Sequence, residues 1–158
     1  MSKVLIVYYS RTGNTEEMAK EVEKGVREVG MECVLKKAED TRPEDLLDAE
    51  GIILGSPCYF GLPAPEIVSL IEESVKFYGK LEGKVGGAFA TSGVLGGGNE
   101  TTVIALIEML LIHGMIVQGT TKGPHYGAVS VGAPGTKELL YARDLGRRVA
   151  RLVRKLFG

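Results

Sequence analysis

The chain has 158 residues, of which 44% are hydrophobic and 25% charged, with 19 Lys and Arg against 20 Asp and Glu. This length and composition predict one globular domain spanning residues 1–158. A formal charge of −1 gives no electrostatic reason to expect nucleic acid or an anionic membrane as partner. The longest apolar stretch, residues 103–112, is interrupted by Glu108 and too short for a membrane span.

Two cysteines, Cys33 and Cys58, are too few for a disulfide framework or a zinc site. The apolar run near the start is too short for a signal peptide and lacks a small-residue cleavage site. We therefore expect a reducing, cytoplasmic environment.

The first half of the chain alternates short apolar runs with helical patterns. A strand is predicted at residues 4–8, and a helix with its apolar face along residues 18–29 ends at Gly30. A second strand at 33–35 is followed by a polar connection with a short helix at 44–48. The third strand, residues 51–55, is continuously apolar, which is typical of a central parallel strand.

The second half repeats this alternation. Pro65 suits the first turn of a helix that reaches about residue 78. A strand at 85–90 leads through a glycine-rich loop to a helix at 101–113. A fifth strand at 115–117 precedes a Gly- and Pro-containing loop and a last helix at 136–156.

This order predicts an α/β protein with helices on both faces of a five-stranded parallel sheet, in the doubly wound order 2-1-3-4-5. Ligands of such sheets bind at the carboxyl ends of the strands, beside the point where the strand order reverses. The loops after the first, third and fourth strands are therefore the candidate site.

The first of these loops, residues 10–15, contains hydroxyls, one glycine and an asparagine. Gly13 permits a tight turn, and Asn14 is expected to cap the following helix, with Glu17 completing a capping box. Hydroxyls and free N–H groups at a helix start form an anion site that fits a phosphate monoester. Ordinary cap and turn residues remain the alternative, since Ser, Thr, Asn and Gly are common there.

The other two loops favour a flat ligand. Residues 56–63 place Tyr59 and Phe60 on a proline-containing turn, where they can stack on a ring or simply pack over the strand ends. Residues 91–100 contain three consecutive glycines, which permit close approach of the backbone or merely a flexible loop. A phosphate at one end and a ring at the other describe a mononucleotide, and FMN is the leading candidate.

These segments carry a family resemblance. Residues 10–15 resemble the phosphate loop of flavodoxins, with the pattern S/T-x-T-G-x-T. The segments GSPCYFG, TSGVLGGGNETT, HGM and PHYGAVSVG are similar to the WrbA family of FMN-dependent NAD(P)H:quinone oxidoreductases, and the likeness runs from end to end. The resemblance implies a flavodoxin-like three-layer fold, FMN as cofactor, NAD(P)H as co-substrate and a quinone or related small acceptor. The chain lacks the tryptophan that this family places beside its substrate pocket.

The resemblance also implies site residues. The FMN-binding positions are Ser10, Arg11, Thr12, Gly13, Asn14, Thr15, Pro57, Cys58, Tyr59, Phe60, Gly61, Thr91, Ser92, Gly93, Val94, Gly96 and Gly97. His113 matches a family histidine near the flavin of a neighbouring subunit, and it is the one catalytic candidate. Its position at a helix end equally suits a role as a helix cap.

The helix up to His113 is apolar nearly all round, which predicts a homo-oligomer, dimer or tetramer, with an interface on residues 103–113. Two other functions stay open. A flavodoxin-type electron carrier is usually strongly acidic, which this chain is not. A binding module without flavin would have little need of three intact loops. Basic residues near the C-terminus, Arg147 to Lys155, fit a solvated helix face better than a ligand site.

Overall fold

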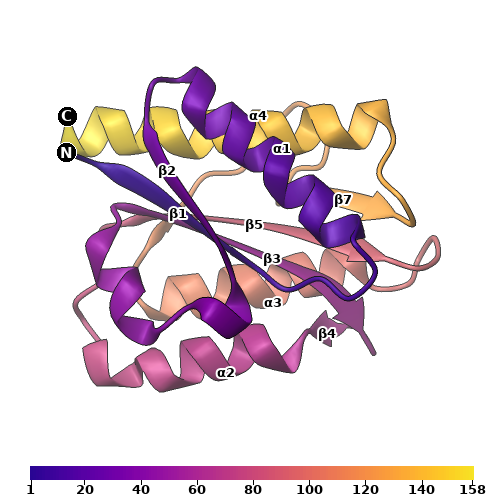
Figure 1. Ribbon diagram of the computed structural model, residues 1–158, viewed down its shortest axis with the longest axis horizontal. Helices are drawn as coiled ribbons and strands as arrows, with labels where there is room; N and C mark the ends of the chain where they lie inside the picture. The colour runs from indigo at the N-terminus through magenta and orange to yellow at the C-terminus, as the bar shows by residue number, and fades with distance from the viewer.

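The computed structural model describes residues 1–158 as one twisted sheet with helices on both faces (Figure 1). The central path of the sheet has the order β2-β1-β3-β5-β6, with all pairs on it parallel. These strands are β1 (Lys3–Tyr8), β2 (Glu32–Lys37), β3 (Gly51–Tyr59), β5 (Val85–Ser92) and β6 (Ile116–Val117). The predicted order 2-1-3-4-5 is therefore confirmed.

Two short strands were not predicted. Strand β4 (Leu62–Pro63) turns back antiparallel onto the end of β3. Strand β7 (Ala128–Val131) pairs with the second half of β5, whereas β6 pairs only with its start. The fifth strand position is therefore shared by two strands, and residues 118–127 lie between them in sequence. The sequence of β7, AVSV, alternates in hydrophobicity, but it lies within a stretch whose glycines predict a loop.

Four α-helices and three short 3₁₀ segments complete the chain. Helices α1 (Asn14–Glu28) and α4 (Thr136–Phe157) cover one face of the sheet, and α2 (Pro65–Glu73) and α3 (Asn99–Ile112) cover the other (Figure 1). The 3₁₀ segments are η1 (Ala38–Asp40), η2 (Pro43–Asp48) and η3 (Ser74–Phe77). No helix combines the length and apolarity that crossing a membrane would need.

The alternation of side chains along β1 divides the core into two layers. Val4, Ile6 and Tyr8 pack with α1 and α4, whereas Leu5 and Val7 face α2 and α3. Fully buried aliphatic side chains close both layers over the central strands β1, β3 and β5, whereas the edge strands β2 and β6 are partly exposed. A continuous apolar strand is what this arrangement requires.

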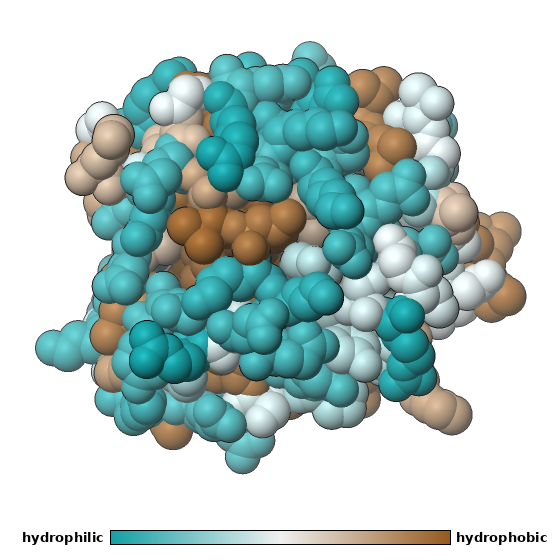
Figure 2. Space-filling model, in the orientation of Figure 1, coloured by the Kyte–Doolittle hydropathy of each residue, from teal (hydrophilic) through white to brown (hydrophobic).

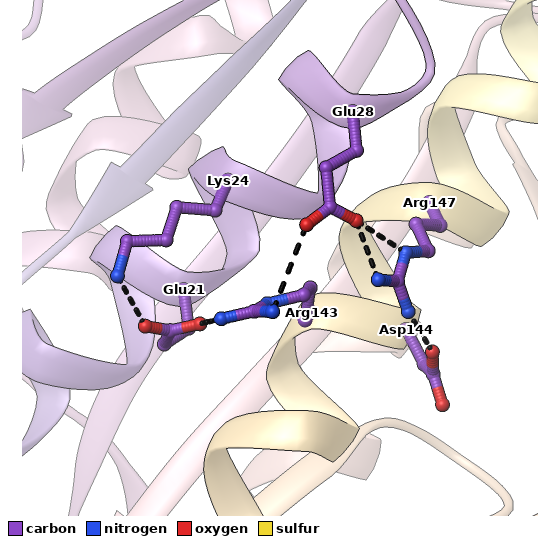
Figure 3. A network of polar contacts seen from close by, with 6 residues as sticks. All are labelled: Glu21, Lys24, Glu28, Arg143, Asp144 and Arg147. Carbon is purple, nitrogen blue, oxygen red and sulfur yellow. Dashed lines mark hydrogen bonds and ion pairs between the residues drawn. The ribbon is translucent and has the colours of Figure 1, made fainter.

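Helices α1 and α4 are joined across their outer side by ion pairs (Figure 3). Arg143 donates two hydrogen bonds to Glu21, at 2.7 and 3.0 Å, and Arg147 donates to Glu28 at 2.6 Å. Burial acts to raise the pKa of Glu21, but hydrogen bonds from Lys24 and Arg143 outweigh it and leave that pKa below its ordinary value. Glu21 is therefore ionised in the folded chain at neutral pH, and the pairs fix the two helices relative to each other.

Candidate functional site

The loops after β1, β3 and β5 enclose one pocket at the carboxyl edge of the sheet, the edge remote from the two chain termini in Figure 1. Its volume is about 330 Å³, within the range of small-molecule sites. Its lining is polar apart from a few side chains, and it consists of Arg11, Thr12, Asn14, Thr15, Pro57, Cys58, Tyr59, Thr91, Ser92 and Gly93.

Helix α1 begins in this pocket with unusually free backbone donors. The residue before it, Gly13, has a φ of 99°, a left-handed conformation that favours glycine, and it has no side chain of its own with which to cap the helix. The expected cap by Asn14 and Glu17 is therefore wrong, because the helix starts at Asn14 itself. Ser10 Oγ accepts the N–H groups of Gly13 and Glu16 at 3.1 and 3.3 Å, and the amides of Asn14 and Thr15 have no partner in the chain. Such amides attract an anion.

Hydrogen bonds between the loops hold the pocket in shape. Thr15 and Thr91, which are 76 residues apart, join their hydroxyls at 2.8 Å, and both side chains are buried. Cys58 Sγ donates to the carbonyl of Gly97 at 3.1 Å, which joins the loop after β3 to the loop after β5. These contacts fix the three loops before any ligand arrives.

Two bonds from the start of α3 add to this support. Asn99 Nδ2 donates to Ser92 Oγ at 3.0 Å, and Thr101 Oγ1 donates to the carbonyl of Gly61 at 2.8 Å. No sequence pattern predicts these contacts of Asn99 and Thr101, because their partners lie 7 and 40 residues away. Helix α3 thus anchors both loops that flank the pocket.

An aromatic group forms one side of the pocket. The Tyr59 ring meets Tyr9 edge-on with ring centres 6.4 Å apart, and the Arg11 guanidinium lies 4.7 Å from the centre of the Tyr59 ring. The hydroxyl of Tyr59 is buried without a hydrogen-bond partner. Burial is the main cause that raises the pKa of Tyr59, partly opposed by the charge of Arg11. Because this hydroxyl is enclosed, Tyr59 offers its ring and not its oxygen to a ligand in the pocket.

Exposed apolar side chains lie on two of the loops that form the pocket. Phe60 has a φ of 52°, rare for a residue other than glycine, and its side chain is fully exposed. Val94 and Leu95 are 65% and 90% exposed on the loop after β5. Figure 2 shows pale and brown surface at the right edge, the side on which Figure 1 places these strand ends. We call Phe60, Val94 and Leu95 the apolar rim.

All ten lining residues belong to the set predicted from the sequence. The seven other predicted cofactor positions lie on the same three loops without lining the cavity, and they are Ser10, Gly13, Phe60, Gly61, Val94, Gly96 and Gly97. Ser10 and Gly13 shape the start of α1, and Gly97 accepts the Cys58 thiol. That these residues contact FMN stays a prediction.

His113 is not brought to this pocket. It follows α3, whose 14 residues extend about 20 Å away from the loop after β5. Its ring is buried, and Nε2 lies 2.8 Å from Ser74 Oγ, whose own proton is donated to the carbonyl of Ile71. Nε2 therefore carries the imidazole proton, and Nδ1 is buried without a partner. Burial lowers the pKa of His113, so the ring is neutral at pH 7.

Comparison with known proteins agrees with this architecture. The flavodoxin family matches residues 6–101. A protein of Archaeoglobus fulgidus named NAD(P)H dehydrogenase (quinone) is 33% identical over 99% of this chain and 100% of its own length. A flavodoxin of Aquifex aeolicus is 39% identical over 97% of this chain and 88% of its own length.

Among solved structures, a flavodoxin, WrbA-like protein from Agrobacterium tumefaciens superposes with a TM-score of 0.82 at 29% identity, covering 98% of this chain and 99% of that one. An archaeal flavodoxin gives a TM-score of 0.81 at 25% identity, covering 96% and 99%. The match extends over whole chains in both comparisons. The chain therefore belongs to the flavodoxin family, within which it has full-length relatives named NAD(P)H dehydrogenase (quinone).

Proposed function

We propose that this protein binds FMN in the pocket at the carboxyl edge and works as an NAD(P)H:quinone oxidoreductase. The observation that carries the proposal is the start of α1, where unpartnered amides and hydroxyls face the same pocket as Tyr59. Relatives that carry this activity in their names match the chain from end to end. We propose a cytoplasmic location, because both cysteines are unpaired.

The residues present fit FMN in chemistry and in size. A phosphate dianion suits the amides of Asn14 and Thr15, the hydroxyl of Thr12 and the positive end of the α1 dipole. A planar ring suits the side of the pocket that Tyr59 lines, because it can stack on the aromatic side chain there. The cavity of about 330 Å³ opens to the surface, so one ring face stays accessible to a second molecule.

The role of the protein side chains in the reaction is to bind the FMN and to orient it and the co-substrate. When bound, FMN supplies the hydride and electron chemistry that no side chain here offers. Cys58 and Thr15 tie the loops together and hold the pocket open. The exposed apolar rim gives a flat, apolar co-substrate a surface on which it can pack and displace water. We infer that NAD(P)H and the quinone use this same mouth in turn.

His113 can take part in the reaction only in a homo-oligomer. Within one chain it lies at the far end of α3, so contact with a flavin requires a neighbouring subunit, as the family resemblance implies. The neutral ring would then act by hydrogen bonding from a fixed position. This role stays a prediction.

The test is an anaerobic titration of the FMN-reconstituted protein. NADH or NADPH should bleach the flavin absorbance directly, and added benzoquinone should restore it within the mixing time. A flavin that nicotinamide fails to reduce, but that a partner reductase reduces, would replace this proposal with an electron carrier. Absence of any bound flavin would overturn the pocket assignment.

An electron carrier is the second candidate, and the Aquifex aeolicus flavodoxin at 39% identity favours it. A carrier also needs an exposed flavin edge and a docking surface, which the apolar rim provides. The near-neutral charge of the chain speaks against electrostatic docking to a redox partner.

A further inference from the structure

The basic residues near the C-terminus do not form one solvated face. Arg147 pairs with Glu28 and donates to Asp144 at 2.8 Å, and Arg154 donates to the carbonyl of Val29 at 3.0 Å. Arg148 and Arg151 have no ion pair or hydrogen bond within the chain. Contacts within the chain therefore account for Arg147 and Arg154, and they leave Arg148 and Arg151 without a partner.

Arg148 is the more unusual of these two. Its Nε is buried and lacks a hydrogen-bond partner, although a guanidinium has five donors to satisfy. Burial lowers the pKa of Arg148, and only the charge of Asp144 acts in the opposite direction. Figure 3 shows Asp144 with its carboxylate turned to Arg147, so Arg148 has no carboxylate of its own. An unpaired, half-buried charge is costly unless a partner arrives from outside.

Arg148 lines a hollow of about 340 Å³ between the start of the β6–β7 connection and α4. The residues around it are all polar, namely Gln118, Thr120, Lys122, Asp144, Arg148 and Arg151. Three side chains are cationic and one is a carboxylate, which Arg147 already binds. The hollow shares no residue with the pocket at the carboxyl edge.

We propose that this hollow, the Arg148 site, binds a small phosphorylated ligand. Two guanidiniums offer planar pairs of donors that match phosphate oxygens, and Lys122 adds a point charge. No hydrophobic residue lines the hollow, so an aromatic or aliphatic ligand would gain less from leaving water here than in an apolar pocket. The polar lining and the surplus of positive charge together select a strongly hydrated anion.

The phosphate can belong to an inorganic ion or to an ester. Orthophosphate, pyrophosphate and ribose 5-phosphate distinguish these sources when titrated separately at constant ionic strength. The protein is first saturated with FMN, so that the loop at residues 10–15 is occupied. Calorimetry gives the affinity, and the ¹H–¹⁵N resonance of Arg148 Nε reports contact at the buried donor.

We expect saturable binding of at least one probe, a shift of the Arg148 Nε resonance, and an affinity lower by about tenfold or more in Arg148→Gln, as for a lost charge-assisted contact. Lys122→Gln changes an exposed side chain, so it tests the same site without disturbing the core. Lys155→Gln, on the same helix but outside the hollow, is the control with an equal change of charge.

Three outcomes would overturn the proposal. The first is no saturable binding of any of the three anions. The second is an equal loss in Lys155→Gln, since that would mean attraction by general charge. The third is binding that both Arg148→Gln and Lys122→Gln leave intact, which would locate the anion elsewhere. None of these outcomes depends on whether nicotinamide reduces the flavin, so the proposed function is tested separately.

Discussion

Thr12 and Thr15 differ in what they do for the empty fold, although both line the same pocket. Thr15 is buried, and its hydroxyl bonds that of Thr91. Thr12 is exposed and has no hydrogen bond within the chain. The hydroxyl of Thr12 is therefore available for a ligand, whereas that of Thr15 also holds two loops together.

Thr12→Val should weaken FMN binding by about tenfold and leave the stability of the flavin-free protein unchanged, because only a contact with the phosphate is lost. Fluorescence titration of FMN gives the affinity, and urea unfolding of the flavin-free protein gives the stability. Thr121→Val, at an exposed position far from the pocket, is the matched control. An unchanged FMN affinity would remove Thr12 from the phosphate site.

Thr15→Val should lower both the FMN affinity and the stability of the flavin-free protein. The isosteric valine leaves the Thr91 hydroxyl buried without its partner, at a cost of about 1–3 kcal/mol in the free energy of unfolding. FMN affinity should fall as well, since the loops after β1 and β5 lose their connection. Equal stability of Thr15→Val and the unmodified protein in urea would contradict this reading of the bond.

The lowered pKa of His113 should make the stability of the protein depend on pH. Because burial lowers its pKa below the ordinary 6.5, the unfolded chain takes up a proton at this ring between pH 6.5 and the folded-state pKa, and the folded chain does not. The free energy of unfolding should therefore fall as pH drops through that window and be unaffected above it. Urea unfolding between about pH 5 and pH 8 measures it. His113→Gln, which can still donate to Ser74, should show a flatter profile; an identical slope would exclude His113 as the cause.

At the scale of elements, α1 and α4 pack closely because each has a glycine at the crossing. A Cβ on Gly25 would collide with the carbonyl oxygen of Arg143, and a Cβ on Gly146 with that of Val22. Neither glycine has a positive φ, so space and not backbone conformation requires it. The ion pairs of Figure 3 lie beside this crossing and depend on it.

Gly25→Ala and Gly146→Ala should each destabilise the protein. The clash with backbone atoms costs about 1–3 kcal/mol, typical of overpacking. We expect the upper part of this range, which exceeds the gain of about 1 kcal/mol that alanine brings within a helix, because a Cβ at either position would meet a backbone oxygen and not a flexible side chain. Thermal and urea unfolding measure the difference, with Lys20→Ala at an exposed position of α1 as control. A stabilising effect of Gly25→Ala would show that the helices can separate without loss.

The regular elements were predictable because each satisfies a local rule. The continuous apolar run of β3 and the face of α1 ending at Gly30 follow directly from periodicity. Strand β7 was missed because only four residues form it, and its pairing with β5 depends on tertiary contact. The predicted cap of α1 by Asn14 was wrong, because Ser10 and not Asn14 accepts a backbone N–H group of the first helical turn. This contact depends on the turn at Gly13.

The site was largely predictable for a different reason. Carboxyl ends of parallel strands meet at one edge, so the loops after β1, β3 and β5 had to be neighbours once the order was known. The contacts that lock them, such as Thr15 with Thr91 and Thr101 with Gly61, join residues far apart in sequence. Pair contacts of this kind leave no periodic signal, and a single sequence does not contain them.

At the scale of the whole molecule, the exposed apolar surface is uneven. One region is the apolar rim of the pocket. Another lies at the end of α3, where Leu111 and Ile112 are 53% and 68% exposed. Tyr78 is 67% exposed, and its ring centre lies 6.3 Å from that of His113, which follows the same helix. Clustered exposed apolar side chains of this size are typical of a contact between subunits.

The predicted homo-oligomer is therefore expected to use the end of α3. Ile112→Glu should shift the protein toward monomer, because a charge buried in an apolar interface has no partner to compensate it. Sedimentation velocity over a range of concentrations measures the change. Leu140→Glu, a 49% exposed leucine on α4 across the sheet, is the control and should leave the assembly intact. A monomer at every concentration of the unmodified chain would contradict the interface, and it would also leave His113 without a neighbouring flavin to reach.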